Sequence, residues 1–146
     1  MASSLTHVDV ARLLAQPSAS VRAEVAAKVA GELDNTLLTA AELDIAHDIV
    51  RAMARDVELT VRQALSHSLR SAVRLPHDVA IRLANDVEAV ALPILIESPV
   101  LTEADLLELV WHGSATRQTA IAGRPDITEP VADAWGPMAA RQRLPR

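Results

Sequence analysis

Three arginines recur in a repeated sequence phrase, and their side chains are the groups in this chain best suited to hold a charged ligand. Arg22 lies in residues 20–25 (SVRAEV), Arg62 in residues 60–65 (TVRQAL) and Arg117 in the fainter copy at residues 115–120 (ATRQTA). A guanidinium group binds carboxylates and phosphates through paired hydrogen bonds, so a row of arginines could hold an acidic ligand. Each arginine also borders an apolar helix face, where it needs hydrogen-bonding partners. We therefore favour structural pairing with the turn carboxylates of Asp56 and Asp86.

Histidines and paired carboxylates give a weaker indication of chemistry. The five histidines are His7, His47, His67, His77 and His112. None follows the spacing that brings two metal ligands onto one helical face, so we expect no metal site and no cofactor. The carboxylate pairs are Asp44 with Asp48 and Asp105 with Glu108; both lie on predicted helix exteriors, where solvated surface is the ordinary interpretation. With no glycine-rich phosphate loop and no serine in a nucleophile elbow, the sequence favours a protein that is not an enzyme.

The composition favours a protein made of helices. Half of the 146 residues are apolar, nearly all of them Ala, Val, Leu or Ile, with two Trp and neither Phe nor Tyr. Such small side chains let helices pack closely, and Ala and Leu are strong helix formers. The chain has no cysteine, no signal-peptide pattern and no apolar run long enough to span a bilayer, so we expect a cytoplasmic protein without membrane contact. The net charge of −5 disfavours nucleic-acid binding.

Capping residues, prolines and apolar spacing predict a series of helices. We place them at residues 6–15, 18–33, 39–55, 59–72, 77–84, 87–97, 102–112, 114–122 and 128–140. Pro93 should kink the helix that contains it, because proline removes one backbone hydrogen bond, and Gly136-Pro137 should shorten or bend the last helix. Trp111 and Trp135 should fill the C-terminal layer; the alternative is that one of them anchors a protein interface. We expect residues 141–146 to be a disordered tail.

Paired helices that return with a similar phrase are typical of a stacked repeat. Val21 and Val61 lie 40 positions apart, close to the period of about 40–47 residues in HEAT and armadillo units. We predict an all-α, right-handed α-solenoid of about four HEAT-like helical hairpins plus a C-terminal half-repeat, forming a single domain over residues 1–146. The predicted repeats span residues 6–33, 39–72, 76–98 and 102–123, followed by the terminal helix at 128–140.

Two longer stretches carry a resemblance to a known family. They are residues 85–101 (NDVEAVALPILIESPVL) and residues 117–127 (RQTAIAGRPDI). The chain resembles the uncharacterised HEAT-like repeat proteins that are common in alphaproteobacteria. The resemblance implies a right-handed stack of helical hairpins and a cytoplasmic bacterial protein, and it implies no established activity.

From these patterns we expect a non-catalytic scaffold or regulatory adaptor that binds another protein on a concave face formed by the second helix of each hairpin. The predicted binding residues are Arg22, Arg62, Gln63, Ser66, Glu97, Arg117 and Gln118. A second copy of the chain, docked on the terminal apolar layer, is another predicted partner. Two alternatives come from other classes. The row of arginines and the basic tail favour nucleic-acid binding, whereas a small-ligand-binding or enzymatic helical-repeat domain would need a deep pocket.

Overall fold

The computed structural model describes residue 11 and residues 15–143, and for residues 137–143 it describes the backbone alone. Within this part of the chain the structure is all-α, with eight helices and no strand. The helices are α2 (Ala19–Glu32), α3 (Ala40–Met53), α4 (Leu59–Leu69), α5 (His77–Ala84), α6 (Glu88–Glu97), α7 (Glu103–His112), α8 (Ala115–Ala122) and α9 (Glu129–Arg143). The predicted helix at residues 6–15 lies almost wholly outside the described residues.

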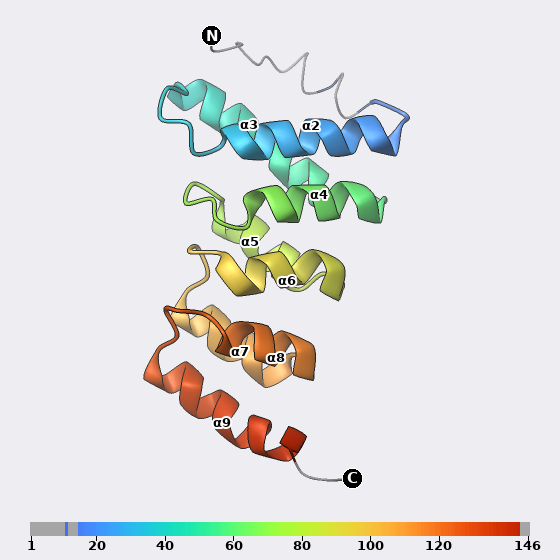
Figure 1. Ribbon diagram of the computed structural model, residues 1–146. Helices are drawn as coiled ribbons and strands as arrows, with labels where there is room; N and C mark the ends of the chain where they lie inside the picture. The colour runs from blue at the N-terminus through green and yellow to red at the C-terminus, as the bar shows by residue number, and fades with distance from the viewer. Residues whose placement is uncertain (1–10, 12–14, 144–146) are drawn as a thin grey trace.

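The helices pack in chain order, so that each contacts only elements near it in sequence. Figure 1 shows α2, α4, α6 and α8 one below the other, with α3, α5 and α7 behind them and α9 at the lower end. Contacts join α2 to α4, α4 to α6 and α6 to α8, and also link each of these helices to a neighbour in the second row. The loops at the starts of α4, α6 and α8 are therefore positioned along one edge of the stack.

Side-chain caps fix where several helices begin. Ser18 and Ser114 each accept a hydrogen bond from the backbone N–H three residues ahead, at the starts of α2 and α8. Thr39 and Thr102 form capping boxes with Glu42 and Asp105, in which each side chain bonds to the backbone of the other residue. A cap satisfies backbone N–H groups that have no partner inside the helix, so it favours one starting residue over its neighbours. The predicted starts of these helices are confirmed.

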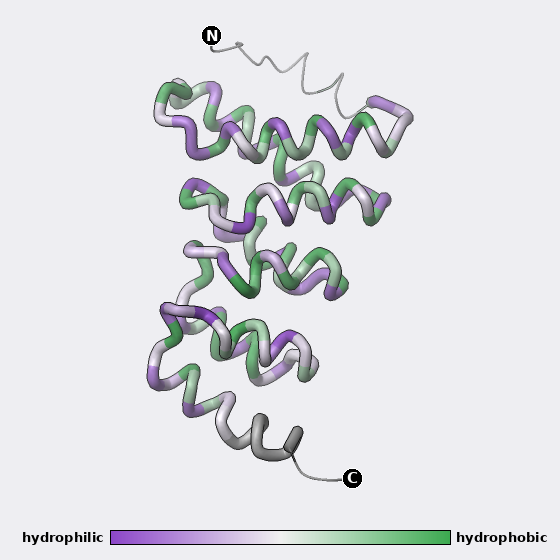
Figure 2. The backbone as a smooth tube through the Cα atoms, in the orientation of Figure 1, coloured by the Kyte–Doolittle hydropathy of each residue, from purple (hydrophilic) through white to green (hydrophobic). Residues whose placement is uncertain are grey.

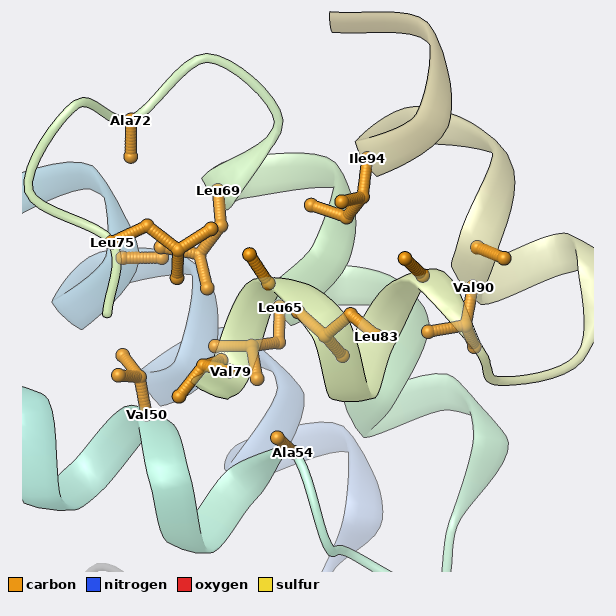
Figure 3. Packing of buried hydrophobic residues seen from close by; sticks show 14 of the residues in the cluster. Val50, Ala54, Leu65, Leu69, Ala72, Leu75, Val79, Leu83, Val90 and Ile94 are labelled. Atoms are coloured by element: carbon orange, nitrogen blue, oxygen red, sulfur yellow. The ribbon is translucent and has the colours of Figure 1, made fainter. Parts of the chain in front are cut away.

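The core is a continuous layer of aliphatic side chains between the two rows of helices. In Figure 3, Val50 of α3, Leu65 of α4, Val79 and Leu83 of α5 and Val90 of α6 point toward one another. All five are buried. Figure 2 shows hydrophobic and hydrophilic residues alternating along the helices, as expected where each helix buries one side. Among the described helices, none combines the length and the apolar character that a membrane crossing requires.

Some expectations differ from the structure at the C-terminal end. α9 continues through Gly136-Pro137 to Arg143, so residues 141–143 are helical rather than part of a tail. By contrast, α6 contains Pro93 and ends at Glu97, which is the end that the sequence predicted. The expectation that Trp111 fills the last layer is wrong, because its side chain is 60% exposed. Trp135 is partly buried and packs against the core.

Candidate interaction surface

Two of the repeated arginines hold neighbouring layers together. Arg22 donates from Nε and Nη2 to both carboxylate oxygens of Asp56, at 2.9 and 3.2 Å. Arg62 makes the same paired contact with Asp86, at 2.8 and 3.3 Å. In each case Nη1 donates to a carbonyl in the loop before the arginine's own helix, which is Gln16 for Arg22 and Asp56 for Arg62. The predicted pairing of these arginines with Asp56 and Asp86 is confirmed.

These ion pairs are mostly withdrawn from solvent, and they shift the acid–base properties of the aspartates. The side chains of Arg62 and Asp86 are only 18% and 16% exposed. Burial raises the pKa of the Asp86 carboxyl, but hydrogen bonds from Arg62 and from the Val87 N–H outweigh it, so the pKa lies below its ordinary value. The pKa of Asp56 is lowered in the same way by Arg22 and by the Glu58 N–H. Both aspartates are therefore ionised at neutral pH.

Arg117 departs from this pattern because it stands at a different position relative to the start of its helix. The cap serine Ser18 bonds the N–H of Val21, one residue before Arg22, whereas Ser114 bonds the N–H of Arg117 itself. One residue is about 100° of helical rotation. Arg117 accordingly reaches back to the α5–α6 loop, where Nη1 donates to the Ala84 carbonyl at 3.0 Å and Nη2 donates to the Asp86 carbonyl.

The remaining predicted binding residues lie in different surroundings. Ser66 is fully buried and its hydroxyl donates to the Val90 carbonyl. Gln118 is also buried, and its Nε2 donates to the Val110 and Gly113 carbonyls. Gln63 is partly exposed on α4, and Glu97 is exposed with a carboxylate oxygen 3.5 Å from Nε of Arg70. The seven residues thus do not form one exposed surface, since some belong to the packing between layers.

Arg124, which lies in the stretch at residues 117–127, is buried and connects α6 to the loop that precedes α9. The residue is only 4% exposed, and its guanidinium group donates to the carbonyls of Leu95 and Ser98 at 2.8 and 2.6 Å. Its Nε also contacts Asp126 at 3.0 Å. The carbonyls at the C-terminal end of a helix have no partner inside the helix, so Arg124 supplies one for α6. Arg124 therefore brings the stretch at residues 117–127 into direct contact with the stretch at residues 85–101.

Two further side-chain contacts join helices of the other row. Arg51 of α3 contacts Asp78 of α5 at 3.0 Å, and His77 of α5 contacts Asp105 of α7 at 2.7 Å. The first pair is exposed, and it lowers the pKa of Asp78. Asp105 is largely buried and also completes the capping box of α7. The first contact joins α3 to α5, and the second joins α5 to α7.

Two hollows lie on either side of α5. The first, called the α5–α7 hollow, has a volume of about 710 Å³ and is lined by α5, α7 and the start of α8; its polar lining includes His77, Asp105, Glu108, His112 and Arg117. The second, called the α3–α5 hollow, has a volume of about 650 Å³ and is lined by Ala54, Arg55, Asp56, Arg62, Asp78, Ile81, Arg82, Asn85 and Asp86. Ile81 and Asn85 line both hollows. The two hollows therefore adjoin along α5.

Sequence reasoning missed the residues at the centre of this surface. Ile81 and Arg82 belong to α5, and Asn85 follows it as the C-cap; the exterior of this short helix had no distinctive spacing. The available signal was the tripeptide Asp-Val-Glu, which occurs at residues 56–58, just before α4, and at residues 86–88, where its Glu88 is the first residue of α6. It marks the two loops that border the α3–α5 hollow. Within the described part of the chain, no group of three or more histidine, aspartate or glutamate side chains could hold a metal ion.

The comparison with known families gives one match. Residues 90–143 match the model of a family described as "Uncharacterised protein conserved in bacteria (DUF2336)". The matched segment includes most of α6 and all of α7, α8 and α9, together with Arg117 and Arg124. No curated protein and no solved structure matches the chain.

Proposed function

We propose that this protein is a non-catalytic interaction module, a HEAT-like α-solenoid that binds another protein along α5. The observation that carries the proposal is the shared lining of the two hollows. Because Ile81 and Asn85 line both, the hollows together form one depression from the end of α3 to the start of α8. A partner segment lying there could contact three successive layers at once, which is the kind of surface that stacked repeats offer.

The packing order supports the solenoid interpretation. α2, α4, α6 and α8 contact one another in series, and each packs against a helix of the second row. The pairs α3–α4, α5–α6 and α7–α8 lie inside the predicted repeats 39–72, 76–98 and 102–123. The Arg22–Asp56 and Arg62–Asp86 contacts each link a helix of one layer to the loop that begins the next layer, as repeating units require.

The surface we propose differs from the face expected from sequence. Ser66 and Gln118 contribute to packing rather than to the surface. Arg62 and Arg117 remain part of it, because Arg62 lines the α3–α5 hollow and Arg117 lines the α5–α7 hollow. The exposed residues available to a partner are found on α5 and α7, among them Arg82 and Glu108.

The lining favours binding over catalysis, because several of its titratable groups already serve the fold. His77 is hydrogen-bonded to Asp105, and Asp105 in turn caps α7. Arg62 and Arg117 hold the α5–α6 loop. A general acid or base must be free to exchange a proton with a substrate, whereas these groups are committed to structural hydrogen bonds.

The experiment is a pull-down from native bacterial lysate with the purified chain as bait. Two variants reverse a charge in the depression, Arg82→Glu and Glu108→Arg, at exposed side chains without hydrogen bonds in the structure. Lys28→Glu on α2 is the matched control, because it makes the same charge change as Arg82→Glu on an exposed helix face outside both hollows. We expect a distinct protein to be recovered with the parent and with Lys28→Glu, and to be lost with both depression variants.

Circular dichroism and a urea titration of each variant check that the fold is retained. Recovery of the same protein by all four baits would refute the proposed surface. Recovery of nucleic acid in place of a protein would instead favour the nucleic-acid alternative. Analytical ultracentrifugation of the parent reports whether the protein recovered is a second copy of the chain.

A further inference from the structure

Two arginines in the α3–α5 hollow have no partner of their own. Among the described residues, neither Arg55 nor Arg82 makes a hydrogen bond or an ion pair through its side chain, and both are exposed. By contrast, the hollow's three aspartates are each held by another arginine. Asp56 is bound by Arg22, Asp78 by Arg51 and Asp86 by Arg62. The guanidinium groups of Arg55 and Arg82 therefore have no carboxylate in direct contact with them.

The position of these arginines allows both to face one ligand. Arg55 follows the end of α3 and Arg82 lies in the last turn of α5, and both line the hollow of about 650 Å³. They also line a smaller adjoining hollow of about 170 Å³, together with Arg51 and Asp78. Two separate hollows that share the same pair of cationic side chains define the place where an anion would lie.

The lining of the α3–α5 hollow is balanced in charge, whereas the chain as a whole is acidic. Its charged members are Arg55, Arg62, Arg82, Asp56, Asp78 and Asp86. The chain as a whole has a net charge of −5. The two arginines without a hydrogen bond therefore offer an anionic group a place that lacks the negative charge of the chain as a whole.

The edge of the hollow favours a peptide over a nucleic acid. Val57 and Val87 directly follow the lining aspartates Asp56 and Asp86, and they are 89% and 51% exposed. Aliphatic side chains suit contact with a peptide, whereas single-stranded nucleic acids are usually held by aromatic side chains that stack on the bases. No aromatic side chain lines either of these two hollows.

We propose that the α3–α5 hollow binds an acidic segment of a partner protein, with Arg55 and Arg82 donating hydrogen bonds to its carboxylates. This inference rests on the proposed function, since it names the chemistry of the partner for one part of the depression. Charged hydrogen bonds of the guanidinium group give the contact its strength and geometry. The aspartates of the hollow keep Arg22, Arg51 and Arg62 in place and leave the other two arginines available.

The test uses a fluorescein-labelled probe peptide, Gly-Glu-Glu-Val-Glu-Glu-Gly, and fluorescence anisotropy at low ionic strength with the full chain. Two further probes are the same peptide with Gln in place of Glu, and a single-stranded oligonucleotide of equal charge. The variants are Arg55→Gln, Arg82→Gln and the double variant, with Lys28→Gln as the matched control. Because neither arginine side chain makes a hydrogen bond or an ion pair with the described residues, we expect the variants to fold, which circular dichroism verifies.

We expect each single variant to weaken the affinity for the acidic peptide roughly three- to tenfold, and the double variant to lose more. Added salt should weaken binding by the parent. Equal binding of the parent and the double variant, equal binding of the Gln peptide, or preferential binding of the oligonucleotide would each overturn the inference. In those cases the proposed function stands if the pull-down still recovers a protein that depends on Glu108.

Discussion

The contact between Arg62 and Asp86 should contribute measurably to stability, and a double-mutant cycle isolates its share. The variants are Arg62→Met, Asp86→Asn and the pair together. Each replacement keeps much of the volume of the original side chain while removing its charge. The difference between the double variant and the sum of the single variants is the coupling free energy of the two side chains.

The expected magnitude follows from the burial of the pair. Exposed ion pairs contribute about 0.2–1 kcal/mol, whereas removing one partner from a fully buried pair costs about 3–5 kcal/mol. The side chains of Arg62 and Asp86 are 18% and 16% exposed, and two hydrogen bonds join them. This places the coupling between the two limits, so we expect about 2 kcal/mol.

Urea unfolding followed by circular dichroism measures the four free energies of unfolding. For a small protein, a change of about 2 kcal/mol moves the urea midpoint by roughly 1 M. A coupling below about 0.5 kcal/mol would refute the reasoning, because it would mean that the layers are held by apolar packing alone. Arg62→Lys is a useful fifth protein, since an ammonium group cannot reproduce the paired contact and should restore little of the lost stability.

Other parts of the structure lead to further expectations. Arg124→Met should destabilise the chain by about 3 kcal/mol in the same urea assay, because it removes the donor that satisfies buried carbonyls at the end of α6. Trp111→Ala should change stability by less than about 1 kcal/mol, since the indole is mostly exposed; a larger loss would show that it packs in solution. Acid should destabilise the protein: the folded pKa values of Asp56 and Asp86 are lowered, so their stabilisation is present near neutral pH and is lost as the pH falls below about 4. Urea midpoints measured across that range should fall less steeply for Asp86→Asn than for the parent.

The sequence predicted the helices well because local signals defined their ends. Ser18, Thr39, Thr102 and Ser114 each cap the helix that was expected to follow. Such signals depend on residues three or four positions apart, so they can be identified without knowledge of the tertiary fold. The ion pairs of Arg22 and Arg62 were also predictable, because arginine beside an apolar face needs a partner and an aspartate stood at each following turn.

The surface could not be predicted to the same degree. Ser66 and Gln118 are polar residues that look suited to a binding face, yet both are buried through hydrogen bonds to carbonyls of neighbouring elements. Arg117 matched the repeated phrase, but its position relative to the helix cap differs by one residue and turns it toward another loop. The hollows arise where α3, α5 and α7 meet, and no spacing within a single helix reports that arrangement.

The Asp-Val-Glu loops at residues 56–58 and 86–88 suggest how the length of such a chain can change during evolution. If residues 57–86 were deleted, Asp56 would be followed directly by Val87 and Glu88, so the tripeptide would be restored at the junction. Arg22 would still find its carboxylate, and α6 would follow it where α4 does now. A duplication of the same segment would likewise create a matched junction. Unequal recombination within this part of the gene would thus add or remove a whole pair of helices while keeping the contact between Arg22 and Asp56.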